Sequence, residues 1–513
     1  MKEKQDLRNN VENLSRRKIL RYLAVGALAG AALSDFSVPP KKVFASAPLV
    51  SGTQIYVPDS YLINKSGSNY QAINGTTGNI DYTNTNASVV INDAVTALTN
   101  GGLIHLAGNT TFNLTTPVSI TGGNNGTNTN TWILEGEGNS SILQQKNAGI
   151  DALVISGETR VVLRNFYINM SGTAGRGIFG NCTSPNYSCF RESIIENVNI
   201  EAGGQTGGTP GAYAYMVYLI NPFQSLIQRC RWSGSPTTAA FRLENGNGSG
   251  GVGTTKFFGN SNFIQLFLNL EGQAAAGCHG LSMGAATSSS IGGSSSTIMN
   301  LNNFAGLYML NQSSTRTGSH GVSLEGGSKF NKFDLVDIEG FDTAIYLNAV
   351  GYGQNQSVYN NTFNGGYIDG ISYNIYTTLQ TRANEFKSLN VAVGGSRGIS
   401  DNGDGGSDAA GPNIFEDLGS GEFFPVSIAT KAIVRGFFGN SYATNNGANT
   451  VGDGGLISHG LLATPKTVIA IGSVAGQIVT VTATSSTAFK VAIKTPSGGS
   501  GSSQTIYWQA SIQ

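Results

Sequence analysis

The stretch "NKFDLVDIEG" (331–340) begins with asparagine and continues with apolar residues at alternate positions. The stretches "NNTFNGGYIDG" (360–370) and "ANEFKSLNVAVGG" (383–395) have the same arrangement. Each unit is too short to bury its own apolar face, so the units must stack on one another. The pattern predicts a parallel β-helix, an all-β fold whose in-pointing Val, Ile, Leu and Phe form one continuous column. Asparagines at equivalent corners are expected to form ladders of side-chain amide hydrogen bonds.

The same short-strand pattern continues on both sides of this stretch. "AGLYML" (305–310), "HGVSLE" (320–325), "TAIYLN" (343–348) and "DGISYN" (369–374) share a small residue, an apolar residue and a polar residue. Short alternating runs extend from about residue 100 to residue 440. We therefore assign residues 48–440 to the β-helix domain.

An amphipathic helix precedes the strands. Residues 86–99 of "NASVVINDAVTALTNGG" (86–102) have apolar residues at helical spacing, with Asn at the start and Gly at the end. A β-helix ends in unpaired backbone groups, which such a helix would cover. We expect it to be the N-terminal cap.

Two further segments follow the β-helix. Residues 441–455 are predicted to be a linker because they are rich in Asn and Gly. Residues 456–513 contain four alternating strands separated by Gly/Ser turns, enough for a small antiparallel β-sandwich. This domain is a candidate cap, binding module or site of homo-oligomerisation.

The first 47 residues have the features of an export signal. "LSRRKILRYLAVGALAGAALS" (14–34) places Arg16 and Arg17 before an apolar run, and "FASA" (44–47) supplies a small-x-small cleavage pattern. Cleavage is expected after Ala47. The segment resembles the twin-arginine export motif, which implies that the protein is secreted or placed on the cell surface already folded. The alternative is an uncleaved membrane anchor.

Composition limits the possible partners. The 513 residues include 30 basic and 30 acidic side chains, so nucleic acid is not an expected partner. The sequence contains no CxxC motif and no His/Cys cluster, so a zinc site is not expected. Of four cysteines, Cys182 and Cys189 flank a loop that a disulfide could close after export.

A family resemblance rests on residues near the cap. The run from "INDAVTALTNGGLIHLAGNTTFNL" (91–114) through "WILEGEG" (132–138) resembles the start of pectate-lyase-like and polygalacturonase-like proteins. This resemblance implies a right-handed parallel β-helix and a polysaccharide ligand. Many members of the superfamily cleave acidic polysaccharides as lyases or hydrolases, whereas others are tailspikes, adhesins or surface coats. Fold alone does not decide between these functions.

The hydrolase motifs of that superfamily are mostly missing. Asn-Thr-Asp and Asp-Asp do not occur in the sequence, and Gly-His-Gly is only approximated at Cys278-His279-Gly280 and Ser319-His320-Gly321. Both histidines occupy the position where other units carry a corner residue. His279 is therefore interpreted as structural, and His320 is kept as a catalytic candidate because it lies near the acidic stretch.

Carboxylates supply the other catalytic candidates. In "FDLVDIEGFD" (333–342) the alternation turns Val336 and Ile338 inward, which leaves Asp337 and Glu339 as outward neighbours. Paired carboxylates can act as general acid and base, and clustered carboxylates can hold calcium for an elimination reaction. The glycine-rich loop 401–408 offers Asp401, Asp404 and Asp408 as possible Ca²⁺ ligands.

Ligand-binding candidates lie nearby in the sequence. Tyrosines are frequent between 346 and 376, and their rings suit stacking on sugars. Arg382 and Lys387 are candidate bases or substrate contacts. The tyrosines chosen as candidates are Tyr346, Tyr352 and Tyr373. The sequence thus predicts a β-helix protein that binds polysaccharide and is a candidate lyase or glycoside hydrolase. The alternative is a non-enzymatic surface, adhesion or tailspike-like structural protein.

Overall fold

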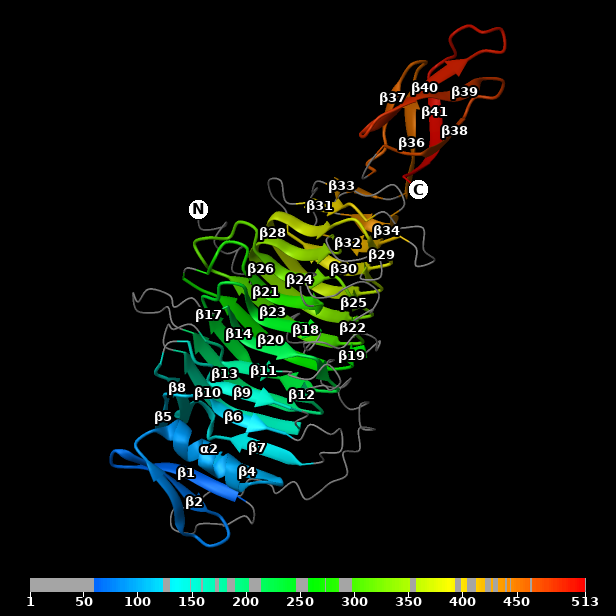
Figure 1. Ribbon diagram of the computed structural model, residues 1–513. Coiled ribbons are helices and arrows are strands. Elements are labelled where there is room, and N and C mark those ends of the chain that lie inside the picture. The colour runs from blue at the N-terminus through cyan, green and yellow to red at the C-terminus, as the bar shows by residue number, and fades with distance from the viewer. Residues whose placement is uncertain are drawn as a thin grey trace. The chain divides into compact units, whose positions relative to one another are not determined.

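The computed structural model describes most of the chain from Ser60 to Ile512 (Figure 1). Residues 1–59 and 513 lie outside the described part, so the signal peptide and its cleavage site are not covered. The remaining gaps are 123–129, 148, 158–159, 171–174, 182–189, 203–213, 246–256, 273, 286–297, 351–356, 393–397, 404–411, 420–425, 428–431, 439–440, 443 and 462–463. The predicted Cys182–Cys189 disulfide also falls outside. Among the helices that are described, none is long and apolar enough to span a membrane.

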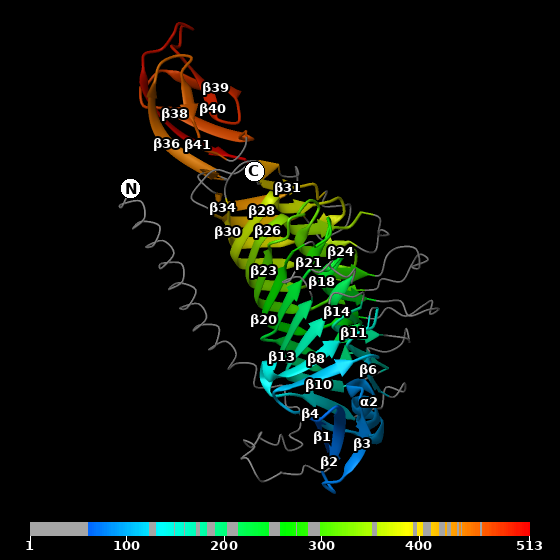
Figure 2. The same cartoon turned by 90° about the vertical axis from the view of Figure 1, so that its left-hand side faces the viewer.

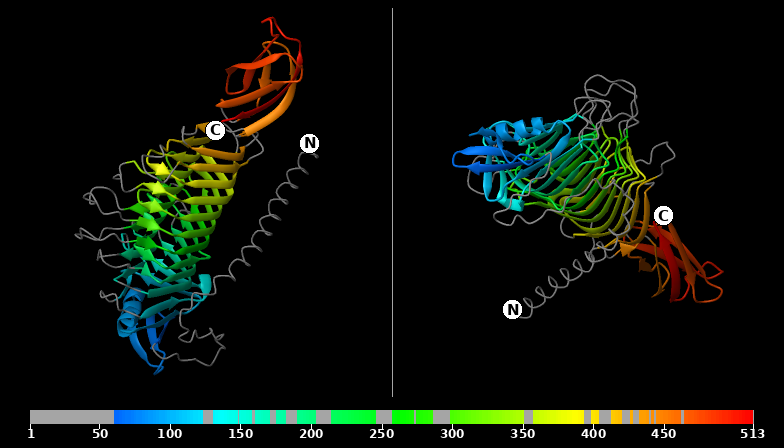
Figure 3. Two further views of the ribbon diagram at one scale, coloured as in Figure 1. Left: turned by 90° about the vertical axis from the view of Figure 1, so that its right-hand side faces the viewer. Right: turned by 90° about the horizontal axis from the view of Figure 1, so that it is seen from below.

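The main domain is a parallel β-helix, as predicted. Successive coils of the chain lie on one another and pair as parallel strands, which Figure 2 shows from the side and Figure 3 from below. Each coil contributes strands to three faces, here called A, B and C. The expected fold class, a right-handed parallel β-helix with an N-terminal cap and a small antiparallel C-terminal domain, is confirmed.

The strands divide among the faces as follows. Several long strands cross from one face to the next. Face A contains β4 (Gly101–Leu106), β7 (Thr131–Glu135), β16 (Leu226–Gln228), β32 (Ile414–Leu418), β34 (Ile433–Phe438) and the first parts of β10 (Arg160–Met170), β13 (Ile194–Ala202), β20 (Asn262–Leu270), β23 (Asn303–Asn311), β26 (Lys332–Asn348), β28 (Thr362–Thr377) and β30 (Glu385–Val391). Face B contains β5 (Thr110–Leu114), β8 (Ser141–Gln145), β17 (Arg231–Gly234), the later parts of β10, β13, β20, β23 and β30, and the middle of β26 and β28.

Face C completes the coil. It contains β6 (Val118–Thr121), β9 (Leu153–Ser156), β11 (Ile178–Asn181), β14 (Tyr215–Ile220), β18 (Ala239–Asn245), β21 (His279–Ala285), β24 (His320–Glu325), β31 (Gly398–Asp401), β33 (Val426–Ser427) and the ends of β26 and β28. A separate seven-stranded sheet of very short strands links face C back to face A: β12 (Phe190–Arg191), β15 (Pro222–Phe223), β19 (Phe257–Gly259), β22 (Ile298–Asn300), β25 (Ser328–Lys329), β27 (Val358–Tyr359) and β29 (Thr381–Arg382).

A single left-handed residue forms the corner between faces A and B. In β26 this residue is Leu335, with φ of 56°, and in β28 it is Gly365, with φ of 71°. One such residue turns the chain without breaking the pairing on either side, so one strand serves two faces. The equivalent residues in other coils are Asn165, Asn197, Arg229, Gln265, Gly306, Ser388 and Asp417.

The predicted polar ladder lies just before face A. The Oδ1 atom of Asn331 accepts hydrogen bonds from the Asn302 backbone N–H at 3.2 Å and from the Asn302 side-chain amide at 2.9 Å. Asn331 in turn donates its N–H and its side-chain amide to Asn361. Serine replaces asparagine in earlier coils. The complete ladder is Ser193, Ser225, Ser261, Asn302, Asn331, Asn361, Asn384 and Asn413, all of them buried.

The interior of the β-helix is a continuous apolar column. Phe333 stacks between Phe304 at 4.6 Å and Phe363 at 4.5 Å, with nearly parallel rings. The stack extends to Phe263 at one end and to Phe386 and Phe415 at the other. Each of these rings is at most 1% exposed. Identical side chains in register thus form a continuous stack along the core, as the alternation predicts.

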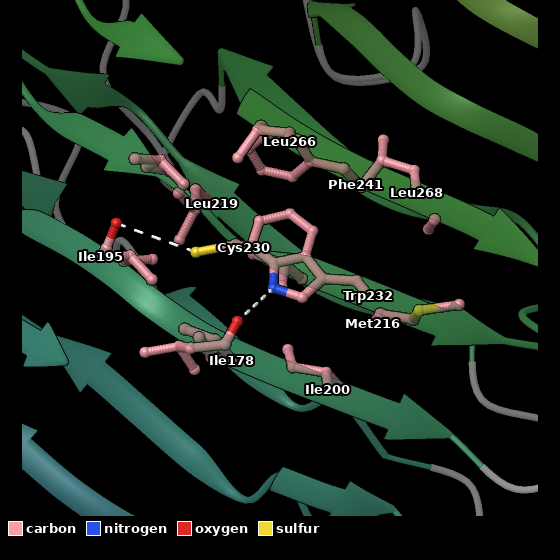
Figure 4. Packing of buried hydrophobic residues seen from close by; sticks show 14 of the residues in the cluster. Ile178, Ile195, Ile200, Met216, Leu219, Cys230, Trp232, Phe241, Leu266 and Leu268 are labelled. Carbon is pink, nitrogen blue, oxygen red and sulfur yellow. Dashed lines mark hydrogen bonds between the residues drawn. The ribbon is translucent and has the colours of Figure 1, made fainter. Parts of the chain in front are cut away.

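Aromatic packing continues in the earlier coils (Figure 4). Trp232 meets Phe241 edge to face at 5.0 Å and donates its indole N–H to the Val198 carbonyl at 3.1 Å. Cys230 is a free, buried thiol in the same cluster. The buried indole N–H of Trp232 is therefore satisfied by a hydrogen bond to the adjacent coil.

The cap forms where it was predicted. Helix α2 (Ala87–Ala97) begins at Asn86, whose side chain accepts a hydrogen bond from the Ser88 N–H, and its apolar side joins the β-helix core. An antiparallel meander of β1 (Ser60–Ser66), β2 (Asn69–Asn74) and β3 (Ile80–Asn84) precedes it, and β1 pairs with β4 in parallel. A short 3₁₀ helix, η2 (Gly138–Ser140), separates β7 from β8. The sequence pattern did not reveal the meander.

The C-terminal domain is a sandwich of two three-stranded antiparallel sheets. One contains β36 (Thr444–Val451), β41 (Gln504–Ser511) and β38 (Thr467–Gly472), and the other contains β37 (Leu456–Ser458), β40 (Ala488–Lys494) and β39 (Ile478–Thr484). Phe489 and Trp508 meet edge to face in its core. The predicted linker at 441–455 is wrong: β35 (Ser441–Tyr442) extends β34, and β36 pairs along its full length with β41.

Candidate functional site

Asp337 and Glu339 lie side by side on the outer surface of face B. The neighbouring Val336 and Ile338 are fully buried in the core, so the alternation predicted from the sequence is confirmed. Both carboxylates belong to the straight part of β26 that follows the corner at Leu335. The strand thus fixes two acidic side chains on one surface, two residues apart.

The adjacent coils add aromatic and acidic side chains to this surface. Asp337 lies in register between Tyr308 of β23 and Tyr367 of β28. Glu339 is in register with Asp369 of β28. Neighbouring strands in a sheet are about 4.8 Å apart. Three carboxyl groups and two tyrosine rings are therefore gathered over three coils.

The surroundings of Asp337 raise the pKa of its carboxyl group. Burial, followed by the charge of Glu339 and a hydrogen bond with it, raises the pKa of Asp337 to about 7. The Oδ1 atom of Asp337 is buried and has no hydrogen-bond partner in the described part of the chain. Two like charges this close favour one shared proton. Near neutral pH, Asp337 can therefore hold a proton beside the Glu339 carboxylate.

An aromatic surface leads away from the pair along face B. The rings of Tyr308 and Phe267 stack at 4.8 Å, and the Arg231 guanidinium lies 5.1 Å from the centre of the Phe267 ring. Burial raises the pKa of Tyr308, and the charges of Glu339 and Asp337 add to this effect. Tyr308 is therefore close to both carboxyl groups. Rings of this kind offer flat apolar surfaces with polar edges, which suit a sugar ring.

The acidic character of face B extends to an earlier coil. Glu201 accepts a hydrogen bond from the Tyr167 hydroxyl. Burial raises the pKa of Glu271, and the charge of Glu201 contributes to that shift. Glu201, Glu271 and Tyr308 were not among the residues predicted from the sequence. A weak signal was present, because "NIEA" (199–202), "NLEG" (269–272) and "DIEG" (337–340) share a polar-apolar-acidic-small pattern.

His320 is not next to the carboxylate pair. It lies on face C at the start of β24, where its register partner in β26 is Thr343, whereas Asp337 and Glu339 are on face B of the same strand. Its ring stacks on His279 at 4.7 Å and on Tyr346 at 4.0 Å. Burial and, to a smaller extent, His279 together lower the pKa of His320 to about 3. The prediction that His320 joins the acidic site is therefore wrong.

The predicted tyrosines also belong to face C. Tyr346 contacts Tyr376 at 5.7 Å, and Tyr373 meets Tyr376 edge to face at 5.0 Å. Tyr352 lies outside the described residues. The structure thus places the predicted carboxylates on face B and the described predicted tyrosines on face C.

The predicted bases lie on other parts of the coil. Lys387 is on face A, 3.0 Å from Glu385 and in register with Asn364. Arg382 is in β29 of the short-strand sheet, where it donates to Ser357 at 3.0 Å and lies 5.6 Å from the centre of the Tyr359 ring. Neither cation is brought to the Asp337–Glu339 pair.

Asp401 has a structural environment. It is 3% exposed, and its Oδ1 atom accepts hydrogen bonds from Asn413, at the end of the ladder, and from Thr377. Asp404 and Asp408 lie outside the described residues. Within the described ranges, no group of three or more His, Cys, Asp or Glu residues is arranged to hold a metal ion.

Face C also contains a buried ion pair that the sequence did not reveal. Arg242 is 5% exposed and donates to Glu325 at 2.8 Å, and Ser282 donates to the same carboxylate at 2.9 Å. Burial acts to raise the pKa of Glu325, but the Arg242 charge and hydrogen bonds hold it below its usual range. Arg242 and Ser282 are in register on adjacent strands, whereas Glu325 is 83 residues from Arg242 in the chain. Only the coil register brings them together.

Comparisons with known proteins give no family assignment. No protein-family model and no curated protein sequence matches the chain. Three solved structures illustrate the similarities that exist. The tailspike protein gp49 from Pseudomonas phage LKA1 is 12% identical, over 82% of this chain and 92% of that chain, with a TM-score of 0.39. The Azotobacter vinelandii mannuronan C-5 epimerase AlgE4 A-module is 11% identical over 69% and 94%, with a TM-score of 0.38.

The third is the catalytic unit of a GH87 alpha-1,3-glucanase from Streptomyces thermodiastaticus, 14% identical over 65% of each chain, with a TM-score of 0.33. Similarities at this level carry no argument about what the chain binds. The chain's own ladder, aromatic stack and parallel register establish the β-helix, and the geometry of face B identifies the candidate site.

Proposed function

We propose that face B binds a polysaccharide and that Asp337 and Glu339 hydrolyse one of its glycosidic bonds. The observation that carries this proposal is the carboxyl pair, in which burial and the Glu339 charge raise the pKa of Asp337 to about 7. Glycoside hydrolysis requires one protonated acid beside one carboxylate. The pair supplies both forms at neutral pH.

The proposed reaction uses the two groups in different roles. Asp337 donates its proton to the glycosidic oxygen as the bond from that oxygen to the anomeric carbon breaks. Glu339 takes a proton from the water whose oxygen bonds to the anomeric carbon. A bound glycosidic oxygen would replace Glu339 as the partner of the Asp337 proton. Tyr308 and Phe267 would hold the adjoining sugar rings.

The location of the basic residues favours hydrolysis over elimination. A lyase needs a base close to the sugar C5 proton and a cation that neutralises the uronate. Lys387 and Arg382 are on other parts of the coil, and Asp401 is hydrogen-bonded to the ladder. In the strands next to the pair, the residues in register with it are Tyr308, Tyr367 and Asp369.

One observation favours a non-enzymatic surface, adhesion or tailspike-like structural protein as the second candidate. Asp337 and Glu339 are two residues apart on one side of β26, close enough for the Glu339 charge to raise the pKa of Asp337. The two carboxyl groups of most glycosidases are about 5 to 9.5 Å apart. In this second candidate, face B binds polysaccharide without cleaving it.

Turnover by the full chain separates the two candidates. The chain is incubated with neutral and uronate polysaccharides, and new reducing ends are measured. We expect Asp337→Asn and Glu339→Gln each to lower the rate about 10²- to 10⁴-fold. Asp334→Asn is the matched control, because Asp334 lies on face A of the same strand and pairs with Lys332. Turnover of no substrate, or equal rates in all variants, would overturn the hydrolase proposal.

The pH profile adds a second readout. Asp337 must be protonated to act as the acid, so activity should fall as the pH rises through about 7. An activity that instead rises through this range would contradict the role given to Asp337.

We also propose that the chain is exported by a twin-arginine-type route to the cell surface or the medium. Arg16 and Arg17 before the apolar run support this proposal. Replacing both with lysine should leave the full-length protein inside the cell, as measured by cell fractionation. Unchanged export of that variant would refute the route.

A further inference from the structure

Face C carries a line of aromatic rings that the carboxylate site does not use. His279, His320, Tyr346, Tyr376 and Tyr373 form the ring track, in which each ring contacts the next at 4.0 to 5.7 Å. The rings come from β21, β24, β26 and β28, which are neighbours in the sheet. At about 4.8 Å per strand, the track extends about 14 Å along face C.

The ring track reaches the surface and has little charge. Tyr373 is 37% exposed, and the other rings of the track are partly buried. Burial lowers the pKa of His279 to about 4 and that of His320 to about 3, so both imidazoles are neutral at physiological pH. The Nδ1 atoms of both histidines are buried and have no hydrogen-bond partner in the described part of the chain. In the neutral tautomer that suits a buried, unpaired Nδ1, the proton is on Nε2 and is available as a donor.

The charged groups beside the ring track neutralise one another. Arg242 donates to Glu325 at 2.8 Å and lies 3.4 Å from Glu244. This cation is therefore already engaged by carboxylates, and it offers poor support for an anionic ligand. Flat rings, neutral donors and compensated charges together suit an uncharged ligand with apolar faces and hydroxyl edges.

We propose that the ring track is a second carbohydrate-binding site, which takes an uncharged saccharide chain. The site is separate from the carboxylate pair, since Glu339 and Tyr346 lie on different faces of the same strand with the corner 340–342 between them. The inference does not rest on the proposed hydrolase activity. Saccharide rings stack on Tyr346, Tyr376 and Tyr373, and hydroxyl groups accept from the histidines at one end.

Calorimetry with short soluble oligosaccharides tests this site. The probes are cello-, malto-, laminari- and chito-oligosaccharides together with oligogalacturonides, each titrated into the full chain carrying Glu339→Gln to suppress turnover. At least one of the uncharged probes is expected to bind. Adding Tyr346→Ala and Tyr376→Ala should weaken that binding tenfold or more, or remove one of two binding sites.

Three controls keep the result specific. Tyr346→Phe with Tyr376→Phe retains both rings and should bind within about threefold of the parent chain, since the stacking surface is unchanged. Tyr507→Ala removes a tyrosine that is 56% exposed in the C-terminal domain and should have no effect. Asp337→Asn, made in the chain with Glu339 intact, should lower turnover while binding at the ring track persists, which distinguishes this proposal from the proposed hydrolase.

Several outcomes would overturn the inference. They are the absence of binding by every uncharged probe, equal affinity in the alanine and phenylalanine pairs, and tighter binding of oligogalacturonides through the same tyrosines. Circular dichroism of each variant checks that the fold is retained. If the alanine pair unfolds, Tyr373→Ala alone provides the test, because Tyr373 is the most exposed ring of the track and its removal leaves no buried cavity.

Discussion

Replacing Asn331 with alanine should break the side-chain hydrogen-bond ladder at one coil. The Asn331 side chain accepts from the Asn302 backbone N–H at 3.2 Å and from the Asn302 amide at 2.9 Å, and it donates to the Met299 carbonyl at 3.1 Å and to Asn361 at 2.9 Å. Asn331 and Asn302 are each 1% exposed, so water cannot replace the lost partners. Alanine therefore removes one bond from each of two buried donors and two buried acceptors.

The expected cost follows from those groups. A buried donor or acceptor left without a partner costs about 1 to 3 kcal/mol, so we expect Asn331→Ala to lower the free energy of unfolding by about 4 kcal/mol. Serine should cost about half as much, because the hydroxyl oxygens of Ser225 and Ser261 already accept from the preceding rung in the same ladder. Asn331→Ser should thus keep an acceptor for the Asn302 N–H.

Hydrogen exchange at the Asn302 amide measures this effect directly, because that N–H bonds to the side chain being replaced. Its protection should fall about a thousandfold in Asn331→Ala and much less in Asn331→Ser, at about 1.4 kcal/mol per tenfold change. Asn364→Ala is the control, since Asn364 is exposed and donates one bond to Asp334. If the Asn302 amide exchanges at the same rate in Asn331→Ala, Asn331→Ser and the control, the ladder hydrogen bonds do not stabilise the coils.

Three other perturbations test the core, the histidines and a tight corner. Phe333→Ala removes a fully buried ring from the stack and should cost about 3 to 5 kcal/mol, seen as a lower urea midpoint, whereas an unchanged midpoint would show that the stack can collapse. His279 and His320 have folded pKa values of about 4 and 3, below the unfolded value of about 6.5, so their contribution is complete above pH 6.5 and is lost as the pH falls towards 4. Acid titration of unfolding should show this loss, and replacing both with glutamine should reduce it. Gly366→Ala places a methyl group 1.9 Å from a backbone carbonyl oxygen at φ of 116° and should cost at least about 2 kcal/mol, whereas Gly476→Ala, at φ of 79° with nothing within 4 Å, should cost about 1 kcal/mol in the same melt.

The repeating parts of the fold could be predicted from the sequence. Asn331, Asn361 and Asn384 each begin a unit with the same alternation, so both the asparagine ladder and the outward position of Asp337 followed from local pattern. The serine half of the ladder could not be recognised, because serine is common throughout the chain. The left-handed Leu335 was also hidden, since leucine rarely adopts that conformation.

The membership of the site could not be predicted, because it depends on register between coils. Ladder neighbours are separated by 41 residues between Ser261 and Asn302 but by only 23 between Asn361 and Asn384. The spacing between coils therefore varies, and the residue that lies beside a given residue on the next coil cannot be found by counting along the sequence. This is why Tyr308 was missed, and why His320 was placed in the wrong group although it is only 17 residues from Asp337.

The unequal spacing of the ladder has a consequence for how such a chain can change in evolution. Insertions of different length between rungs leave every rung bonded to the next, so the scaffold tolerates growth or loss in its connecting loops. A whole turn of chain is in the same way a removable unit, since its strands pair with those of the two adjacent turns. The surface side chains of one turn, and any activity they carry, can therefore be gained or lost while the strand pairing of the other turns is kept.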